Sequence, residues 1–378
     1  MNVLLLSSRF PWPPYTGDRL RATIWLSALE DVANVALVAP AGAIPRNAPP
    51  LRFYPAARSL GRGVAGALRV LGGAPVHALL AAPYDWADAI ERARKDLGTF
   101  DATVVILSRL DPWVRDLLPA GMHILDAIDL LQRNMIERAS EASPLTSWFW
   151  RGESRRIGRV EQDAARAYDR LLVVSEDESD EVGALVISSG ARIAPLREGT
   201  RSIDFGFWGR LAYFANADAV NWLLDEIWPA VRAQRPEATL LIAGADAPAR
   251  MHAAHGRDGI TVQSPVDDVA AMARTIKVAL FPIRYGTGQS GKALEAAEAG
   301  CAIVATARAM RGLAPLAAHS FLAEDAPGLA RAAVEALADE PRRVSHARAL
   351  RAAVETNYSR QNTFARLAAL IRSGAAAA

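Results

Sequence analysis

Cysteine is nearly absent from the sequence: Cys301 is the single one among 378 residues. One thiol excludes an internal disulfide and any metal site built from several cysteines. Cys301 opens the apolar run Cys301–Ala305, so we expect it to be a small, buried core residue. A chain without disulfides is compatible with a reducing cytosol.

Long apolar runs are also missing. No stretch approaches the roughly 20 apolar residues that a transmembrane helix needs. The apolar segment Met1–Leu6 lacks the basic region that begins a signal peptide, and Arg9 ends it early. Both features argue against a signal peptide. We therefore expect a cytoplasmic protein that touches the inner face of a membrane at most peripherally. The segment Trp148–Arg151, with further arginines up to Arg159, suits a membrane interface, although a helix packed on its own domain is the favoured interpretation.

The chain carries little net charge. Its 43 Lys and Arg residues against 41 Asp and Glu residues leave a formal charge of +2, so we expect no nucleic-acid partner. A hydrophobic fraction of 51% with 22% charged residues is typical of a folded chain. Its length exceeds one ordinary core and suggests two domains.

What the sequence does contain is a repeated alternation of short apolar runs and amphipathic segments. Apolar runs without polar alternation are typical of parallel strands covered on both faces. In the first half these predicted strands are Val3–Leu6, Val35–Val38, Val104–Leu107, Ile124–Leu125 and Leu171–Val174. In the second half they are Ile203–Trp208, Thr239–Ala243, Ile260–Val262, Val278–Pro282 and Ala302–Thr306. We predict an α/β protein with two successive doubly wound domains.

The predicted boundaries follow from a polar stretch at 197–202 and from the composition of the C-terminus. We predict an N-terminal Rossmann-like domain at 1–197 and a second one at 198–355. Helical periodicity runs from about Pro341 to Ile371, and the part at 356–372 is predicted to pack back toward the N-terminal domain. Residues 373–378 form a predicted frayed tail. A ligand would lie in a cleft between the domains, at the carboxyl ends of the strands.

A glycine-rich loop, Gly286–Lys292, follows the predicted strand Val278–Pro282 and precedes a predicted helix. Glycines allow the backbone to turn sharply and to approach a ligand closely. The helix N-terminus behind them offers unpaired N–H groups and partial positive charge. Together these features predict a phosphate site.

Three named motifs compete for this loop. Gly286, Gly288 and Gly291 satisfy the dinucleotide fingerprint, but no acid follows near Thr306 to hold a ribose. The P-loop pattern fits less well, because Ala293 stands where a hydroxyl should hold magnesium. Both motifs also belong after the first strand of a domain, whereas this loop follows the fourth.

The third interpretation uses the two charged residues behind the glycines. Lys292 and Glu295 are three apart and share one helix face. A lysine there can neutralise a diphosphate leaving group, and a glutamate one turn later can accept hydrogen bonds from the two hydroxyls of a ribose. A solvated Lys–Glu pair is the structural alternative. The pattern favours a nucleoside-diphosphate-sugar site.

The sequence resembles glycosyltransferase family 4, whose fold is GT-B. Within that family it resembles most the sugar transferases of exosortase and exopolysaccharide loci. The resemblance covers nearly the whole chain. It rests on the loop Ser8–Asp18, on Asn216–Val220 and, most specifically, on Gly288–Thr306. It implies two Rossmann-like domains facing across a cleft, polysaccharide biosynthesis, and retaining transfer of a hexose. The donor would be a UDP-, GDP- or dTDP-sugar, with no cofactor or metal required.

The resemblance also implies roles for particular residues. Glu295 would hold the ribose, Lys292 and Arg210 the diphosphate, and Asp18 would join them in catalysis. The donor-binding positions are Gly17, Arg210, Thr287, Gly288, Gln289, Ser290, Gly291, Lys292 and Glu295. Pro265 and Val266 would contact the base through their backbone. The acceptor, a glycan, a lipid-linked sugar or a small molecule, would meet Arg21, Asp126 and Asp129, with structural roles as the alternative for these.

The sequence departs from the family pattern at two positions. Thr287 stands where many members carry a glutamate for the sugar hydroxyls, and Ala215 where they carry a phosphate-binding lysine. Two further hypotheses therefore stay open. One is a GT-B-like protein that binds a nucleotide sugar without turning it over, and the other is an NAD(P)-dependent oxidoreductase.

Overall fold

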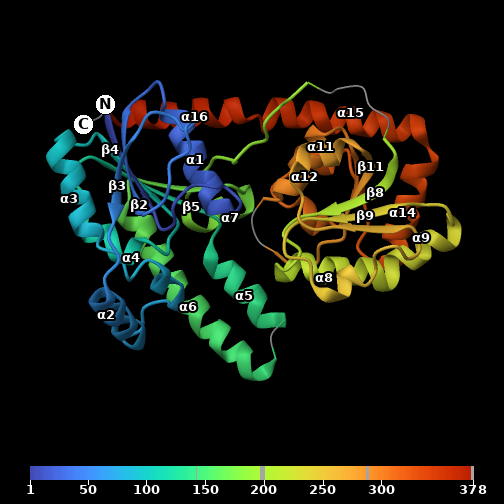
Figure 1. Ribbon diagram of the computed structural model, residues 1–378, viewed down its shortest axis with the longest axis horizontal. Coiled ribbons are helices and arrows are strands. Elements are labelled where there is room, and N and C mark those ends of the chain that lie inside the picture. The colour runs from blue at the N-terminus through green and yellow to red at the C-terminus, as the bar shows by residue number, and fades with distance from the viewer. Residues whose placement is uncertain (142, 196–200, 287–288, 376–378) are drawn as a thin grey trace. The chain divides into compact units, whose positions relative to one another are not determined.

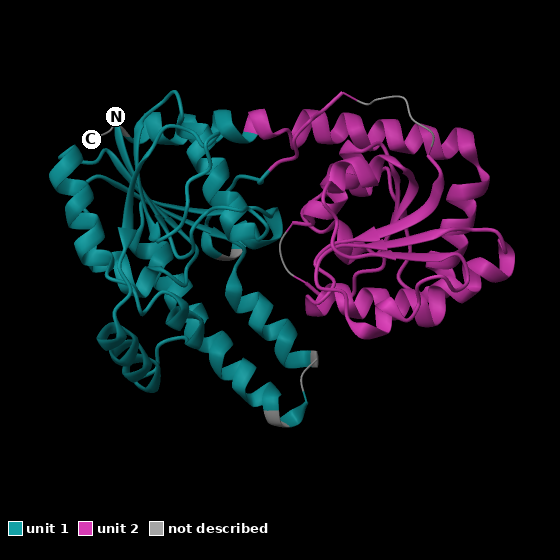
Figure 2. Cartoon of the chain, viewed as in Figure 1, with its two compact units in different colours: residues 1–189, 363–378 teal, residues 190–362 magenta. Residues whose placement is uncertain are grey.

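The computed structural model describes residues 1–141, 143–195, 201–286 and 289–375. The chain divides into two compact units (Figure 2). Unit 1 comprises Met1–Ser189 and Thr363–Ala378, and unit 2 comprises Gly190–Asn362. The sequence placed these divisions at 197/198 and 355/356, close to but not at the observed ones. Of the polar stretch at 197–202, used to place the first division, residues 197–200 lie outside the described residues.

Unit 1 is built on a parallel sheet with strand order β3-β2-β1-β4-β5-β6-β7. The strands are β1 (Asn2–Ser7), β2 (Asn34–Pro40), β3 (Arg52–Ala56), β4 (Ala102–Ile106), β5 (Met122–Ile128), β6 (Arg170–Val173) and β7 (Leu185–Val186). Their central residues are buried on both faces, because helices cover each side of the sheet (Figure 1).

The helices of unit 1 connect these strands and cover the sheet. They are α1 (Gly17–Leu29), α2 (Leu60–Leu71), η1 (Val76–Leu80), α3 (Trp86–Leu97), α4 (Asp111–Val114), η2 (Arg115–Leu117), α5 (Leu131–Glu141), α6 (Pro144–Ala167) and α7 (Glu176–Val182). The C-terminal α16 (Arg360–Ala375) adds Leu367 and Ile371 to the core that contains Val3 and Leu5.

Unit 2 repeats this architecture with the strand order β10-β9-β8-β11-β12-β13, again parallel. Its strands are β8 (Ile203–Trp208), β9 (Leu240–Ala243), β10 (Ile260–Gln263), β11 (Ile276–Phe281), β12 (Ala302–Ala305) and β13 (Phe321–Leu322). The order reverses between β8 and β11. In an open parallel sheet, the carboxyl ends of the strands at such a switch point border a ligand crevice.

The helices of unit 2 lie on both faces of this sheet (Figure 1). They are α8 (Phe214–Trp222), η3 (Leu223–Ile227), α9 (Trp228–Gln234), α10 (Ala249–His252), α11 (Val269–Arg274), α12 (Gly291–Glu298), η4 (Ala307–Met310), α13 (Ala314–Ala317), α14 (Ala326–Ala338) and α15 (Glu340–Asn357). Cys301 is fully buried in this core, as the sequence predicts.

The α/β class and the two Rossmann-like sheets are confirmed, while several boundaries differ. The predicted strand through Leu107 ends at Ile106, because Leu107 takes a left-handed conformation with φ of 70°. The helical run predicted for 341–371 is two helices, α15 and α16, separated at Tyr358 and Ser359. The short strands β3, β7 and β13 were not predicted.

Candidate functional site

The switch point of unit 2, where a ligand crevice is expected, is bordered by the loops that follow β8, β9 and β11. The loop after β8 contains Gly209, whose φ of 150° favours glycine. It packs against Gly244, where a Cβ would come within 1.7 Å of the Gly209 carbonyl oxygen. Only glycine fits at position 244, so the backbone itself forms this wall of the crevice.

The glycine-rich loop after β11 leads into α12. Gly286 has a φ of 123°, again favouring glycine. Ser290 precedes the helix without a side-chain cap, and a Cβ on Gly291 would meet nothing within 4 Å. The helix start is therefore open on the side of Gly291, and the unpaired N–H groups of a first turn are what an anion site uses. Thr287 and Gly288 lie outside the described residues.

Lys292, in the first turn of α12, is held by residues from β8 and α8. Its ammonium donates to Oδ1 of Asn216 and lies 5.1 Å from the centre of the Phe207 ring. The amide nitrogen of Asn216 donates in turn to the carbonyl oxygen of Arg210 at 2.8 Å. Burial lowers the pKa of Lys292 to about 8, against the opposing charge of Glu295. The cation is thus held in place and costly to desolvate, and an approaching anion would stabilise it.

Glu295 lies one turn further along α12. Its Oε2 accepts a hydrogen bond from the indole N–H of Trp208 at 2.9 Å. The surrounding protein raises the pKa of Glu295, while Trp208 and Lys292 oppose this. Part of the side chain stays exposed, so solvent or a ligand can reach the carboxyl group. One oxygen is oriented by Trp208, and the carboxylate keeps capacity to accept from a ligand hydroxyl.

Arg210 follows Gly209 at the end of β8. Its Nε donates to Asp246 at 2.9 Å, in a pair whose two side chains are more than half exposed. Such a pair is worth little and can exchange for a ligand anion. The structure brings Lys292, Glu295 and the Arg210 backbone together through Asn216 and Trp208, but it directs the Arg210 guanidinium toward Asp246.

One of the two departures from the family pattern, Ala215, can be placed in the structure, as can the predicted base contacts. Ala215 is buried, and its Cβ is 3.8 Å from where a Cβ on Gly286 would lie. Position 215 therefore borders the glycine-rich loop, where a lysine would add a cation. Pro265 and Val266, the predicted base contacts, lie after β10; Pro265 is exposed and Val266 packs partly against the core.

The positions that decide against the competing motifs are also defined. Ala293 is fully buried in the core of unit 2 and carries no hydroxyl that could hold a metal. Thr306 is buried, and its hydroxyl donates to Ile283 and caps η4 at Ala309. That position therefore has a structural role where a dinucleotide site would need an acid.

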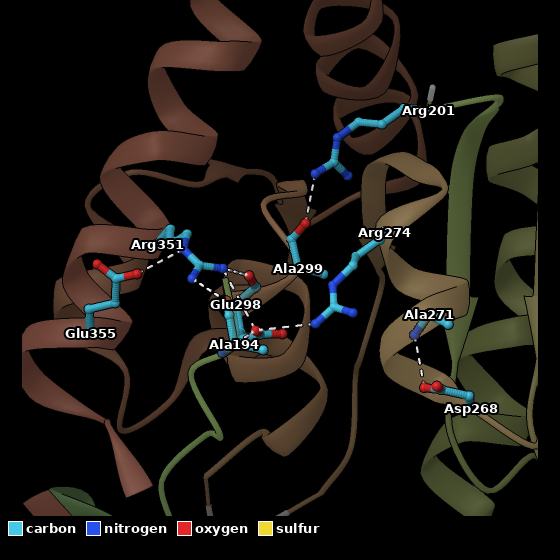
Figure 3. A network of polar contacts seen from close by, with 9 residues as sticks. All are labelled: Ala194, Arg201, Asp268, Ala271, Arg274, Glu298, Ala299, Arg351 and Glu355. Carbon is cyan, nitrogen blue, oxygen red and sulfur yellow. Dashed lines mark hydrogen bonds and ion pairs between the residues drawn. The ribbon is translucent and has the colours of Figure 1, made fainter. Parts of the chain in front are cut away.

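A buried ion cluster fixes the other end of α12 (Figure 3). Oε1 of Glu298 lies 3.6 Å from Arg274 and 3.7 Å from Arg351, and accepts from the backbone N–H of Ala194 at 3.0 Å. Arg351 also donates to the carbonyl oxygens of Ala194, at 2.6 Å, and of Glu298. Glu298 thus ties α12 to α15 and α11 and holds the helix that presents Lys292 and Glu295.

Unit 1 has its own switch point, between β1 and β4, and charged residues lie on the loops that follow these strands. Gly17 faces open space. Asp18 is buried, accepts from the Thr16 hydroxyl at 2.6 Å, and lies 3.5 Å from Arg9. Asp18 lies in the first turn of α1, whose N-cap position is Thr16 and which has no side-chain cap.

Arg109, on the loop after β4, was not predicted from the sequence to be a site residue. Burial lowers its pKa, with Asp18 opposing and Arg9 adding to the effect. Its Nε, like that of Arg19, is buried without a hydrogen-bond partner among the described residues. Arg9 and Arg109 lie around the single carboxylate of Asp18, so positive charge is in excess at this point of unit 1. One feature of the sequence points to Arg109: it lies just past a predicted buried strand.

The predicted acceptor residues Arg21 and Asp126 lie inside unit 1. Both side chains are fully buried, with Arg21 Nε 2.7 Å from Asp126 Oδ2. Trp25 donates to the same oxygen at 2.7 Å, and Arg21 also donates to the Ser188 carbonyl oxygen at 3.1 Å. In this arrangement the two residues bond to each other and stabilise the fold rather than present groups to an acceptor.

Asp129 is close to Glu178 of α7, and both carboxyls are largely enclosed. Burial, reinforced by Asp126, raises the pKa of Asp129 to about 7. Burial and Asp129 raise the pKa of Glu178 to about 8. Two neighbouring enclosed carboxyls cannot both ionise cheaply, so the pair holds a proton at neutral pH.

Comparison with known proteins finds one family model that part of the chain matches. Residues 202–339 match the family model described as Glycosyl transferases group 1. A comparison with curated protein sequences found no match. Among the described residues there is no group of three or more His, Cys, Asp or Glu side chains placed to hold a metal ion.

Similar solved structures cover essentially the whole chain. Sucrose-phosphate synthase from Thermosynechococcus elongatus matches with a TM-score of 0.77 and 14% identity over 100% of both chains. HepE from Anabaena, solved with UDP-glucose, matches with a TM-score of 0.68 and 13% identity over 99% of this chain and 100% of that one. WaaG, a glycosyltransferase involved in lipopolysaccharide biosynthesis, matches with a TM-score of 0.65 and 15% identity over 99% and 100%. Together the comparisons show the GT-B fold, and residues 202–339 are similar to the glycosyl transferases group 1 family.

Proposed function

We propose that the protein is a retaining glycosyltransferase that moves a hexose from a nucleoside-diphosphate sugar to an acceptor. The observation on which this rests is the pair Lys292 and Glu295 at the start of α12, each held by a partner from the β8 end of the crevice. The family match over 202–339 includes this pair, and a similar structure contains UDP-glucose.

The proposed donor contacts follow from the chemistry of each group. The Lys292 ammonium and the N–H groups of Gln289, Ser290 and Gly291 would neutralise the diphosphate. Glu295, oriented by Trp208, would accept from the ribose hydroxyls. Arg210 would exchange Asp246 for phosphate, and the backbone at Pro265 and Val266 would contact the base. Contacts by Gly17 with the phosphate and by Thr287 and Gly288 with the donor rest on the family resemblance.

The mechanism we propose requires no metal and no dedicated base. When the leaving phosphate oxygen takes the proton of the acceptor hydroxyl, the protein contributes position and charge. Lys292 and the α12 N–H groups would stabilise the negative charge that develops as the bond to the diphosphate breaks. Asp18, with Arg9 and Arg109 beside it, is our candidate for orienting the acceptor.

The acceptor and the setting are proposals of the same kind. The resemblance to exosortase- and exopolysaccharide-associated transferases favours a glycan or a lipid-linked sugar made at the inner face of a membrane. No helix within the described residues is long and apolar enough to cross a bilayer. Contact would therefore be peripheral, and Trp148 is one exposed aromatic available for it.

The two competing hypotheses have different standing. An NAD(P)-dependent oxidoreductase is disfavoured, because the glycine-rich loop follows β11 rather than β8, the first strand of its unit. A protein that binds a nucleotide sugar without turnover is the stronger alternative, since Ala215 removes a cation beside the loop. Both alternatives predict no release of nucleoside diphosphate.

A panel of UDP-, GDP- and dTDP-linked sugars tests the proposal. Thermal shift identifies the donor, because a ligand that binds only the folded state raises its stability. Release of nucleoside diphosphate then reports hydrolysis or transfer. Glu295→Ala should lose donor affinity, whereas Glu237→Ala, an exposed glutamate of the same unit, should not. Full donor affinity in Glu295→Ala would contradict the ribose assignment, and binding without turnover would favour the alternative.

A further inference from the structure

Helix α2 (Leu60–Leu71) turns its apolar side chains away from the protein. Four aliphatic side chains recur at helical spacing and share one face. Leu60, Val64, Leu68 and Leu71 are 87%, 63%, 63% and 83% exposed. We refer to these four side chains as the α2 apolar face. Scattered exposed leucines need no explanation, but a continuous row on one helix does.

The opposite side of α2 is what holds the helix to unit 1. Gly66 is its one buried residue. A Cβ at that position would come within 2.4 Å of the Ala82 Cβ and 3.3 Å of the Trp113 ring. The helix thus rests on the unit through its backbone, where a glycine permits close approach. Figure 1 shows α2 at the periphery of unit 1, away from the sheet. A small rotation of α2 would therefore not bury the α2 apolar face in the core of unit 1.

The charge of the sequence segment that contains α2 indicates what covers this face. Between Asp31 and Asp85 the sequence contains no Asp or Glu, and it contains five arginines: Arg46, Arg52, Arg58, Arg62 and Arg69. Some are engaged within the unit, Arg62 with Asp85 and Arg69 over the Trp113 ring. Arg46 and Arg58 are exposed. An apolar helix face in a segment that has arginines and no acidic residues suits a lipid bilayer, which is apolar inside and anionic at its surface.

We propose that α2 is an interfacial helix that inserts its apolar face into a membrane containing anionic lipids. The helix lies flat, with Leu60, Val64, Leu68 and Leu71 among the acyl chains and Arg58 near the headgroups. A second copy of the chain is the less suitable occupant, because pairing two α2 faces would bring two acid-free, arginine-bearing segments together. The proposal does not depend on the proposed transferase activity.

Binding of the full-length chain to vesicles tests this directly. We expect co-sedimentation with vesicles of equimolar phosphatidylcholine and phosphatidylglycerol, and weaker binding to phosphatidylcholine alone. The double variant Val64→Gln, Leu68→Gln keeps helix propensity but removes apolar surface, and should lower the partition coefficient at least about tenfold. Leu117→Gln, an exposed leucine of η2 in the same unit, is the matched control.

Further variants and measurements test the contributions of charge, of the aromatic Trp148 and of self-association to vesicle binding. Arg46→Gln with Arg58→Gln should reduce the preference for anionic vesicles, as should 0.5 M salt. Trp148→Gln should leave most binding intact. Circular dichroism and thermal unfolding confirm that each variant folds. Absence of wild-type binding to anionic vesicles, or equal binding by the Val64, Leu68 double variant, would overturn the proposal. A dimer seen by light scattering that the same double variant dissolves would assign the face to a second copy.

Discussion

The indole N–H of Trp208 donates to the carboxylate of Glu295 across 2.9 Å, joining the last residue of β8 to the second turn of α12. Trp208 is buried and packs edge-on against Phe281 of β11, with ring centres 5.0 Å apart. The indole is therefore held by the sheet, and it fixes the direction of a carboxylate that the helix alone would leave free to rotate.

Replacing Trp208 by Phe should weaken nucleotide binding through Glu295. The variant keeps the aromatic packing and loses one hydrogen bond to a partly exposed carboxylate, worth about 1 kcal/mol, or roughly fivefold in affinity. Calorimetric titration with the nucleoside diphosphate measures the loss. Trp222→Phe, in the same unit, is the control, because its ring contact is with Arg284. If Glu295→Ala weakens binding and Trp208→Phe does not, the indole has no orienting role.

The lowered pKa of Lys292 predicts a pH-dependent donor affinity. Below its value of about 8 the ammonium is charged and attracts the diphosphate; as the pH rises through 8 that charge is lost. The dissociation constant should therefore begin to rise near pH 8, up to about tenfold per pH unit. Lys292→Arg keeps its charge and should show a flat profile to pH 9.5. A wild-type profile that is equally flat would show that Lys292 does not contact the diphosphate.

The buried pair Arg21 and Asp126 should be a large contributor to stability. Asp126→Ala would leave the Arg21 guanidinium enclosed and unpaired, which costs about 3–5 kcal/mol of unfolding free energy. Urea unfolding measures this. The exposed pair Arg94 and Glu91 of α3 supplies the control, since Glu91→Gln should leave the unfolding free energy nearly unchanged. A stable Asp126→Ala variant with impaired transfer would instead return these residues to the acceptor role expected from sequence.

The enclosed carboxyls of Asp129 and Glu178 predict stability that falls with rising pH. Their pKa values in the folded state, about 7 and about 8, lie above those of an unfolded chain near 4. The folded state therefore binds more protons between about pH 4 and 8, and this contribution is lost as the pH rises through 7 and 8. Arg21, Asp126, Arg133 and Glu161 are the charged groups that act on this pair.

Glu178→Gln tests this, because the amide resembles the protonated acid and does not ionise. The unfolding free energy of the wild type should drop more steeply from pH 6 to pH 8.5 than that of the variant. Glu237→Gln, an exposed glutamate, should behave as the wild type. Parallel pH profiles for the wild type and Glu178→Gln would show that the carboxyl is already ionised at neutral pH.

Much of the fold was predictable from local pattern. Central strands such as β1, β4 and β8 are short apolar runs, since a parallel strand is buried on both faces. Edge strands β3, β7 and β13 escaped prediction, because β7 and β13 are two residues long and β3 is interrupted by Pro55. The break between α15 and α16 was also missed, since Tyr358 and Ser359 are not strong helix breakers.

The two-domain α/β class, the glycine-rich loop and the helix that presents Lys292 and Glu295 follow from local sequence. They depend on neighbouring residues, whose spacing can be read along the chain. The groups that lie beside Lys292 and Glu295 depend on the tertiary fold. Asn216 and Trp208 reach Lys292 and Glu295 of α12 across 76 and 87 positions, and Ala194 donates to Glu298, at the end of the same helix, across 104. Likewise, Asp126 pairs with Arg21 over 105 positions. Burial, and with it the pKa of Lys292, Asp129 and Glu178, is set by such distant neighbours, and local sequence does not encode them.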